Sequence, residues 1–298
     1  MSSILTNNGA MVALQTLTSI NKSLGATQNE ISTGKSVANA KDNSAIWAIS
    51  KVMESDVKGF QAVSQSLSLG ESTVSVARAT AEGVTDTLQA IKKEIVGAQD
   101  GTISREKLAE RVKALTAQIA SNVESAQVNG VNLVNDTAET RIDSDADGTG
   151  DVKGITVISS LDRSATGVAA SKIDAAAINL KTDALIGQDV AGADLALDAL
   201  DFTTDAGVAD ALSAIEGMIE QATTAAASFG SVQSRMSMQN EFVTKLSDSL
   251  KSGIGSLVDA NMEEASARLQ ALQVQQQLAT QSLSIANQAP QSILSLFR

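Results

Sequence analysis

The side chains best arranged for metal chemistry in this chain form an acidic run near its middle. The run matches positions one, three, five, six and nine of a calcium-binding loop at Asp143, Asp145, Asp147, Gly148 and Asp151. Position twelve is Gly154 instead of the bidentate Glu that such loops use, and no clear helical pattern flanks the run. An acidic surface turn is therefore the favoured interpretation. Calcium at Asp143, Asp145 and Asp147 is the weaker hypothesis.

The amino-acid composition excludes most other kinds of catalytic and metal site. The chain has no His and no Cys, which excludes Ser-His-Asp and Cys-His nucleophiles, zinc sites that use these ligands, and iron–sulfur clusters. Glu263 and Glu264 have no neighbour that suggests acid–base catalysis, and we expect them to be surface charges. The sequence thus predicts a protein that is not an enzyme and that needs no cofactor.

Charge and hydropathy limit the partners. With 34 acidic and 22 basic residues the net charge is -12, which disfavours nucleic-acid binding because that depends on clustered Lys and Arg. No apolar stretch is long enough to cross a bilayer, and the N-terminus lacks the basic region of a cleaved signal peptide. We therefore expect no nucleic acid, no membrane insertion and no export by the usual cleaved signal.

Helical seams dominate the pattern. Hydrophobic residues make up 43% of the chain but aromatic residues only 2%, and the single proline is Pro290, so slim helix-on-helix packing is favoured over a thick core. At both ends of the chain, residues that are mostly apolar are spaced alternately by four and three, which is the spacing of a coiled-coil seam. The front seam is Ala10, Ala13, Leu17, Ile20, Leu24, Thr27 and Ile31; the back seam is Val258, Met262, Ala265, Leu269, Leu272, Gln276, Ala279, Leu283, Ala286 and Ile293.

Between these ends the pattern changes several times. Residues 32–45 break the first helix, and Trp47 is expected to pack beside this connecting segment. The 3/4 alternation returns from Phe60 to Ile95, and Ser104 can cap a helix that runs to about residue 127. Asn129-Gly130 between valines predicts a tight hairpin turn. Residues 136–204 have no long seam, and helical pattern resumes from Asp205 with a possible break at Gly253-Ile254-Gly255.

The predicted fold is mainly α: long antiparallel helical coiled-coil terminal segments with a β-hairpin and a small β-containing central insert. Specific motifs lie at the front at 21–24, 31–35, 40–43 and 128–131, and at the back at 229–235, 262–265 and in the closing run IANQAPQSILSLFR at 285–298. Through these motifs the chain resembles bacterial flagellins over about residues 1–135 and 205–298. The closing run is the most specific of these motifs.

This resemblance implies a self-polymerising filament subunit that is extracellular and lacks enzymatic activity. It implies an inner coiled-coil layer from 1–42 and 256–298, a surrounding helical layer from 43–135 and 205–255, and a small variable surface domain at 136–204. The subunit interface would then include Leu17, Ile20, Leu24, Ile31, Leu269, Leu272, Leu283, Ile293, Leu296 and Phe297.

The implied partners are identical or isoform flagellin subunits, filament cap and hook-junction proteins, and a cytoplasmic export chaperone. The implied route is the flagellar type III apparatus, and the implied purpose is swimming. A hook–filament junction protein shares the terminal pattern and is the nearest alternative. A soluble signalling coiled coil is an alternative of another class, and Asn129-Gly130 and the β insert argue against it.

Overall fold

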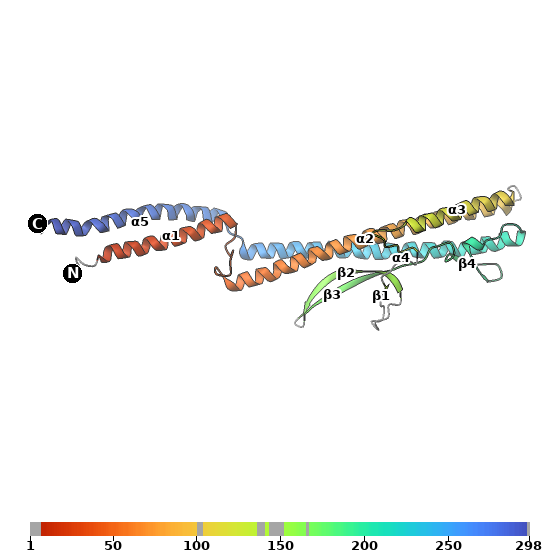
Figure 1. The fold of residues 1–298 in the computed structure, drawn as a ribbon, viewed down its shortest axis with the longest axis horizontal. Coiled ribbons are helices and arrows are strands. Elements are labelled where there is room, and N and C mark those ends of the chain that lie inside the picture. The colour runs from red at the N-terminus through yellow and green to blue at the C-terminus, as the bar shows by residue number, and fades with distance from the viewer. Residues whose placement is uncertain (1–6, 100–103, 136–140, 143–151, 165–166, 297–298) are drawn as a thin grey trace. The chain divides into compact units, whose positions relative to one another are not determined.

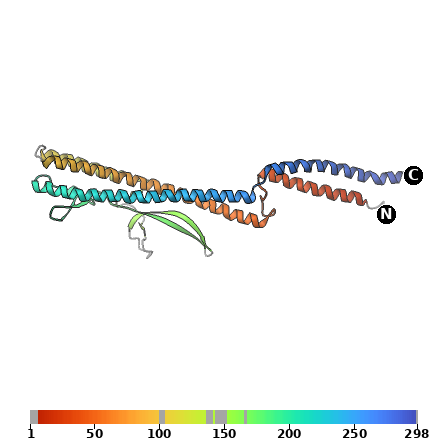
Figure 2. The ribbon, with the colours of Figure 1, turned by 180° about the vertical axis from the view of Figure 1, so that it is seen from behind.

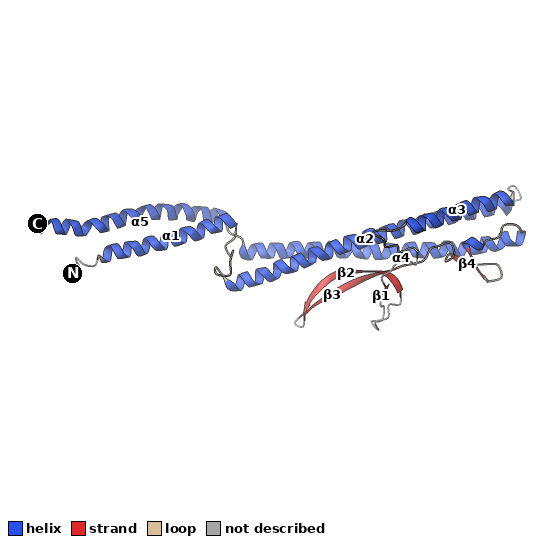
Figure 3. Cartoon of the chain, in the orientation of Figure 1, coloured by secondary structure: helices blue, strands red, loops and turns tan. Residues whose placement is uncertain are grey.

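The structure is a computed structural model that describes residues 7–99, 104–135, 141–142, 152–164 and 167–296. It is mainly α-helical with two small antiparallel sheets, which confirms the predicted fold class (Figure 3). The helices are α1 (Asn8–Thr33), α2 (Ser44–Gln99), α3 (Arg105–Ser125), α4 (Asp205–Val258) and α5 (Met262–Leu296). The strands are β1 (Arg141–Ile142), β2 (Val152–Ser164), β3 (Gly167–Ala176), β4 (Ile186–Gln188) and β5 (Asp194–Ala196), followed by the 3₁₀ helix η1 (Leu197–Ala199).

The chain folds into two compact units. We call them the terminal unit, Met1–Val57 with Asp248–Arg298, and the central unit, Lys58–Ser247. Helices α2 and α4 each contribute residues to both units. The predicted boundaries at residues 42, 135, 204 and 255 describe layers of an assembled polymer, so they stay predictions.

The core of the central unit is the seam between α2 and α4, which run antiparallel. Polar contacts beside the seam join Ser64 Oγ to Asn240 Oδ1 at 2.6 Å and Arg78 Nε to Gln233 Oε1 at 2.9 Å. The predicted α2 seam positions after Phe60 are all buried: Val63, Leu67, Gly70, Val74, Ala77, Ala81, Val84, Leu88, Ile91 and Ile95. Because the spacing alternates three and four, one face of a long helix is kept against its partner throughout.

Helix α3 packs its apolar face into the same core through Leu108, Val112, Ile119 and Val123. Ser104 occupies the N-cap position as predicted, but its side chain makes no capping hydrogen bond, so the expected hydroxyl cap is wrong. Glu106 in the first turn still places a negative charge near the positive end of the helix dipole.

The Asn129-Gly130 turn has the predicted geometry. Asn129 has φ 52° and Gly130 φ 82°, the positive values of a type I′ turn. Val128 and Val131 exchange backbone hydrogen bonds of 2.9 and 3.0 Å, but pairing stops at this one bridge. The buried Asn132 side chain then anchors the chain to the end of α3: its Nδ2 donates to the Val123 carbonyl, and its Oδ1 accepts from the Val134 amide.

The long β2–β3 hairpin lies along the helices of the central unit (Figures 1 and 2). Gln239 Nε2 on α4 donates to the Ser159 carbonyl at 3.0 Å. Gly70 on α2 has no side chain where Val157 approaches: a Cβ there would lie 2.5 Å from Val157 Cγ2. Glycine at this seam position therefore allows the hairpin to sit directly on the helix. The acidic run Asp143, Asp145 and Asp147 lies outside the described residues.

Candidate functional site

Helices α1 and α5 of the terminal unit form an antiparallel pair, side by side in both views (Figures 1 and 2). Three polar contacts set the register along its length. Asn7 Nδ2 donates to the Ala286 carbonyl at 2.8 Å, and Gln276 Nε2 donates to Asn21 Oδ1 at 2.7 Å. Arg268 lies 3.9 Å from a Glu30 carboxylate oxygen. Specific polar pairs between two helices favour the register in which both partners meet.

The predicted seam residues are brought together within one chain. Those whose side chains the structure describes are half-buried: Leu17, Ile20, Leu24 and Ile31 on α1, and Leu269, Leu272 and Leu283 on α5. Ile293 and Leu296 belong to α5, but their side chains, like all of Phe297, lie outside the described part. Since α1 and α5 cover much of each other's seam, a role of these residues in contacts between subunits stays a prediction.

The only polar member of the front seam is also its most buried member. Thr27 is 3% exposed, whereas the leucines and isoleucines around it are half-buried. On α5, the buried positions among the described side chains are the small residues Ala265 and Ala279. The pair is therefore a narrow contact with little enclosed apolar volume.

Six large apolar side chains of the pair point away from the seam and are more than half exposed. They are Met11, Val12 and Leu14 on α1, and Val274, Leu278 and Ile285 on α5. Met11, Leu14 and Thr18 line a shallow groove with Gln15, Ser19 and Lys22. Sequence reasoning missed these residues because it followed a single heptad register, although the 3/4 spacing of Met11, Leu14 and Thr18 is a visible second register.

Charge is almost absent from the same pair. Residues 269–297 contain no Asp, Glu, Lys or Arg, and Lys22 is the only such residue from 7 to 29, although the whole chain carries a net charge of -12. Large apolar patches without charge are unusual on a monomer surface and mark interaction sites. Equal copies can approach such a surface without electrostatic repulsion.

The connecting segments at the end of this pair are joined by backbone hydrogen bonds. Helix α1 ends at Gly34, whose φ of 69° is the left-handed conformation that glycine adopts without strain. The Ser36 amide donates to the Val258 carbonyl at 2.7 Å, and the Ala260 amide donates to the Gly34 carbonyl at 2.9 Å. Lys35 and Asp259 thus form an antiparallel bridge. We call residues 34–43 and 259–261 the joint.

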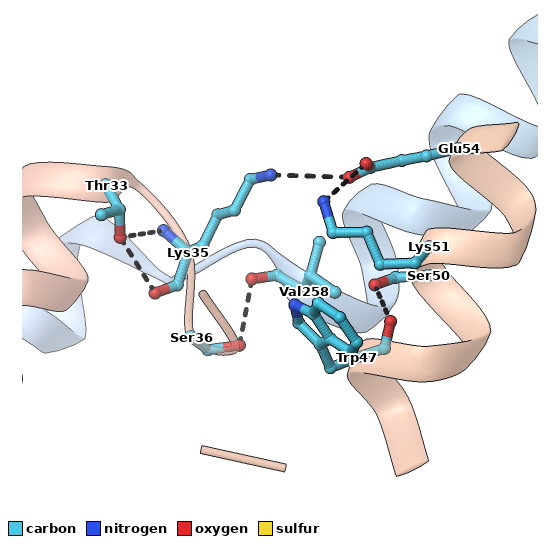
Figure 4. Close-up of polar contacts among 8 residues, drawn as sticks. All are labelled: Thr33, Lys35, Ser36, Trp47, Ser50, Lys51, Glu54 and Val258. Carbon is cyan, nitrogen blue, oxygen red and sulfur yellow. Dashed lines mark hydrogen bonds and ion pairs between the residues drawn. The ribbon is translucent and has the colours of Figure 1, made fainter. Parts of the chain in front are cut away.

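Side chains around the joint add polar contacts (Figure 4). Ser36 Oγ donates to the Val258 carbonyl at 3.2 Å. Glu54 accepts from Lys51 Nζ at 2.7 Å, and Lys35 Nζ lies 3.8 Å from the other Glu54 oxygen. Trp47, expected to pack beside this segment, is half-buried.

Helix α4 continues to Val258, beyond the glycines at 253 and 255, so the possible break there is not present. Gly253 instead lets the helix pass close to a neighbour, since a Cβ there would lie 3.2 Å from Met53 Cε.

The described residues offer contact surfaces more than reactive groups. They contain no group of three or more acidic side chains that could hold a metal ion. No helix among them is long and apolar enough to span a bilayer. What distinguishes the terminal unit is a helix pair with few charged residues and with apolar side chains on its outer faces.

Comparisons with known proteins point the same way. Residues 4–139 match the family model of the bacterial flagellin N-terminal helical region, and residues 212–297 match that of the C-terminal helical region. The chain is 39% identical to "Flagellin" of Brucella melitensis, with all of both chains covered. It is 37% identical to "Flagellin FljK" of Caulobacter vibrioides, covering all of this chain and 99% of the other, and 35% identical to "Flagellin C" of Rhizobium meliloti, covering all of both.

Proposed function

Since this chain belongs to the bacterial flagellin family, and is thereby a structural filament protein and not an enzyme, we propose that its terminal helix pair is the principal surface through which subunits polymerise. In this proposal α1 and α5 form the inner layer of the filament, and the exposed outer faces of the pair are covered by neighbouring copies. The subunit is exported by the flagellar type III apparatus, and the filament serves swimming. Its further partners are cap and hook-junction proteins and a cytoplasmic export chaperone.

The observation that carries this proposal is the exposure of six apolar side chains on a helix pair with few charged residues. Each is between 55% and 68% exposed. Full burial of such a side chain contributes about 1.5–3 kcal/mol, so covering what remains exposed would contribute roughly 1–2 kcal/mol for each. The set of six would contribute about 6–12 kcal/mol before the entropic costs of association. A monomer gains none of this, and a polymer gains it at every subunit.

A charge placed in the seam tests the proposal. We expect purified wild-type protein to form long tubes, visible by negative-stain microscopy after salt-induced polymerisation. Leu272→Asp should form none, because it places an ion in a half-buried apolar contact between α5 and α1. Ser121→Asp is the matched control, since it adds the same charge at an exposed position of α3. Normal tubes from Leu272→Asp would show that the pair is not the assembling surface.

The length of the polymer distinguishes a filament subunit from the nearest alternative. A hook–filament junction protein would form short rings under the conditions that give a filament subunit long tubes. Export and motility need a living host: expression in a bacterium that lacks its own filament protein should give an extracellular product of uncleaved mass and restore a swimming halo. An intracellular product, or a cleaved N-terminus, would contradict the proposed route.

A further inference from the structure

A groove in the central unit lies between α3 and the segment of chain that leads through η1 to α4. Its volume is about 550 Å³, which is within the range of protein sites that bind small molecules. One wall is a stripe of α3 that includes the small side chains of Ala109, Ala117 and Ala120. The facing wall includes the large apolar side chains of Leu197 and Phe202. We call this space the α3 groove.

Packing and hydrogen bonds hold the facing wall in place without a ligand. Leu197 is 2% exposed and Phe202 6%, and both side chains belong to the core of the central unit. The Leu197 amide donates to the Leu185 carbonyl at 3.1 Å, and Gln221 Nε2 on α4 donates to the Ala184 carbonyl at 3.2 Å. Because the wall is already ordered, a ligand that enters the groove loses little free energy to ordering of the protein.

Four polar side chains line the α3 groove beside the apolar ones. Lys113 and Asp198 are exposed, and they are the only charged side chains among the described residues that line it. Thr116 and Thr182 are half-buried. None of these four side chains forms a hydrogen bond or an ion pair with another described residue. One cation, one anion and two hydroxyl groups are therefore available to a ligand.

The opposite charges of Lys113 and Asp198 favour a zwitterion over an ion of either sign. An anion is attracted by Lys113 but repelled by Asp198, and a cation meets the reverse. A free peptide carries an ammonium group at one end and a carboxylate at the other, and each end can form a charge-assisted hydrogen bond with one of these side chains. The amide groups of a peptide can also bond to the two threonine hydroxyls, and apolar peptide side chains suit the apolar walls.

The length of the α3 groove indicates the size of the ligand. Its α3 wall extends from Ala109 to Ala120, which is about 16 Å at a rise of ~1.5 Å per residue. An extended peptide covers about 3.3–3.6 Å per residue, so about three to five residues would fill this length. A single amino acid would leave most of the groove empty.

We propose that the α3 groove binds short apolar peptides with free termini. The peptide carboxylate lies on Lys113, the peptide ammonium group lies on Asp198, and the apolar side chains lie between the alanines of α3 and the facing wall. This binding activity is additional to the proposed role in a filament. It does not depend on that role, because every residue of the groove belongs to one chain and the groove is present in the monomer.

Isothermal titration calorimetry of the monomeric protein with trileucine tests the proposal. We expect saturable binding of trileucine, and binding at least about tenfold weaker for N-acetyl-trileucine amide, which lacks both terminal charges. Lys113→Ala and Asp198→Ala should each weaken the binding of trileucine by at least about fivefold. Lys107→Ala and Asp86→Ala are the matched controls: they remove the same charges at exposed helical positions outside the groove and should change the Kd less than about twofold.

A thiol placed in the groove gives an independent readout. The chain has no Cys, so Ala117→Cys introduces a unique thiol at an exposed position of the α3 wall. Saturating trileucine should slow the reaction of this thiol with a maleimide by at least about threefold, because the bound peptide blocks access to it. Ser121→Cys, at an exposed position of α3 outside the groove, is the control and should react at the same rate with and without the peptide.

The outcomes separate this inference from the proposed function. Absence of saturable heat together with an unprotected thiol in the Ala117→Cys variant would overturn the peptide site. Equal binding of trileucine and its capped form would overturn recognition of the two termini, and tighter binding of decanoate than of trileucine would replace the peptide by an acyl chain. A protein that polymerises but does not bind trileucine would overturn only this inference. A protein that binds trileucine but does not polymerise would overturn only the proposed function.

Discussion

Truncation of Leu88 tests whether the α2–α4 seam holds the central unit together in the monomer. Leu88 is 0% exposed, lies in the C-terminal half of the α2 seam, and belongs to the large core cluster. Leu→Ala changes at fully buried sites lower the free energy of unfolding by about 2.7–5 kcal/mol, which combines lost burial with the cavity left behind. We expect Leu88→Ala to cost about 3–4 kcal/mol. Leu69→Ala, on the same helix but at a position 52% exposed, should cost less than about 1 kcal/mol.

Urea unfolding under monomeric conditions measures both changes. With a denaturant slope of about 2–3 kcal/mol/M for a unit of this size, Leu88→Ala should lower the midpoint followed by circular dichroism by roughly 1–2 M, and Leu69→Ala by less than about 0.5 M. The single tryptophan, Trp47, belongs to the terminal unit and gives a separate signal.

The terminal unit has few fully buried side chains, so Trp47 fluorescence should change at lower urea than circular dichroism, and Leu88→Ala should not move that transition. A Leu88→Ala midpoint within about 0.3 M of wild type would refute the assignment of the seam as the main stabilising contact.

Two further changes probe single positions. Gly130→Ala should lower the free energy of unfolding by about 1–2 kcal/mol in thermal or urea unfolding, because a Cβ meets nothing within 4 Å and the whole cost is the backbone φ of 82°; an unchanged protein would mean that the turn is not held in this conformation. The Thr203 amide and hydroxyl donate hydrogen bonds to the Asp201 carboxylate and hold the pKa of this carboxyl below its ordinary 3.8. The stabilisation that these bonds give to the start of α4 should therefore be complete above pH 3.8. It should be lost as the pH falls through the lower pKa that Asp201 has in the folded protein. Carboxyl NMR titration should therefore place the pKa of Asp201 below 3.8, and Asp201→Asn should remove this acid-dependent step.

Local periodicity was enough to predict the long helices and their buried faces. The α2 seam from Val63 to Ile95 matched at every position, and the front seam placed even its polar member, Thr27, inside the pair. These predictions succeed because a heptad seam depends only on spacing along one helix. The possible break at Gly253-Ile254-Gly255 was wrong because packing around a long helix outweighs the weak helix propensity of two glycines.

Features that depend on distant residues could not be predicted in this way. The bridge between Lys35 and Asp259 joins backbone groups more than 220 residues apart, and no side-chain pattern marks it. Side-chain exposure could not be predicted from the sequence either. The pattern around Met238 and Phe242 predicts only that the helix continues, and the folded structure is needed to show that both side chains are exposed. The sequence pattern thus identified which residues pack within the chain, while the apolar side chains left exposed could be recognised only from the fold.

The backbone bridge at the joint holds two distant parts of the chain together, so the number of residues between them can change without changing the bridge. The chain leaves the bridge at residue 36 and comes back to it at residue 258, so the residues between them form one long loop that is closed at the bridge. Lengthening such a loop raises the entropic cost of closing it only slightly, because that cost grows with the logarithm of the loop length. Residues could therefore be gained or lost far from the bridge while the geometry of the two terminal helices stays the same. Variation in the middle and constancy at the ends would then follow from chain topology alone.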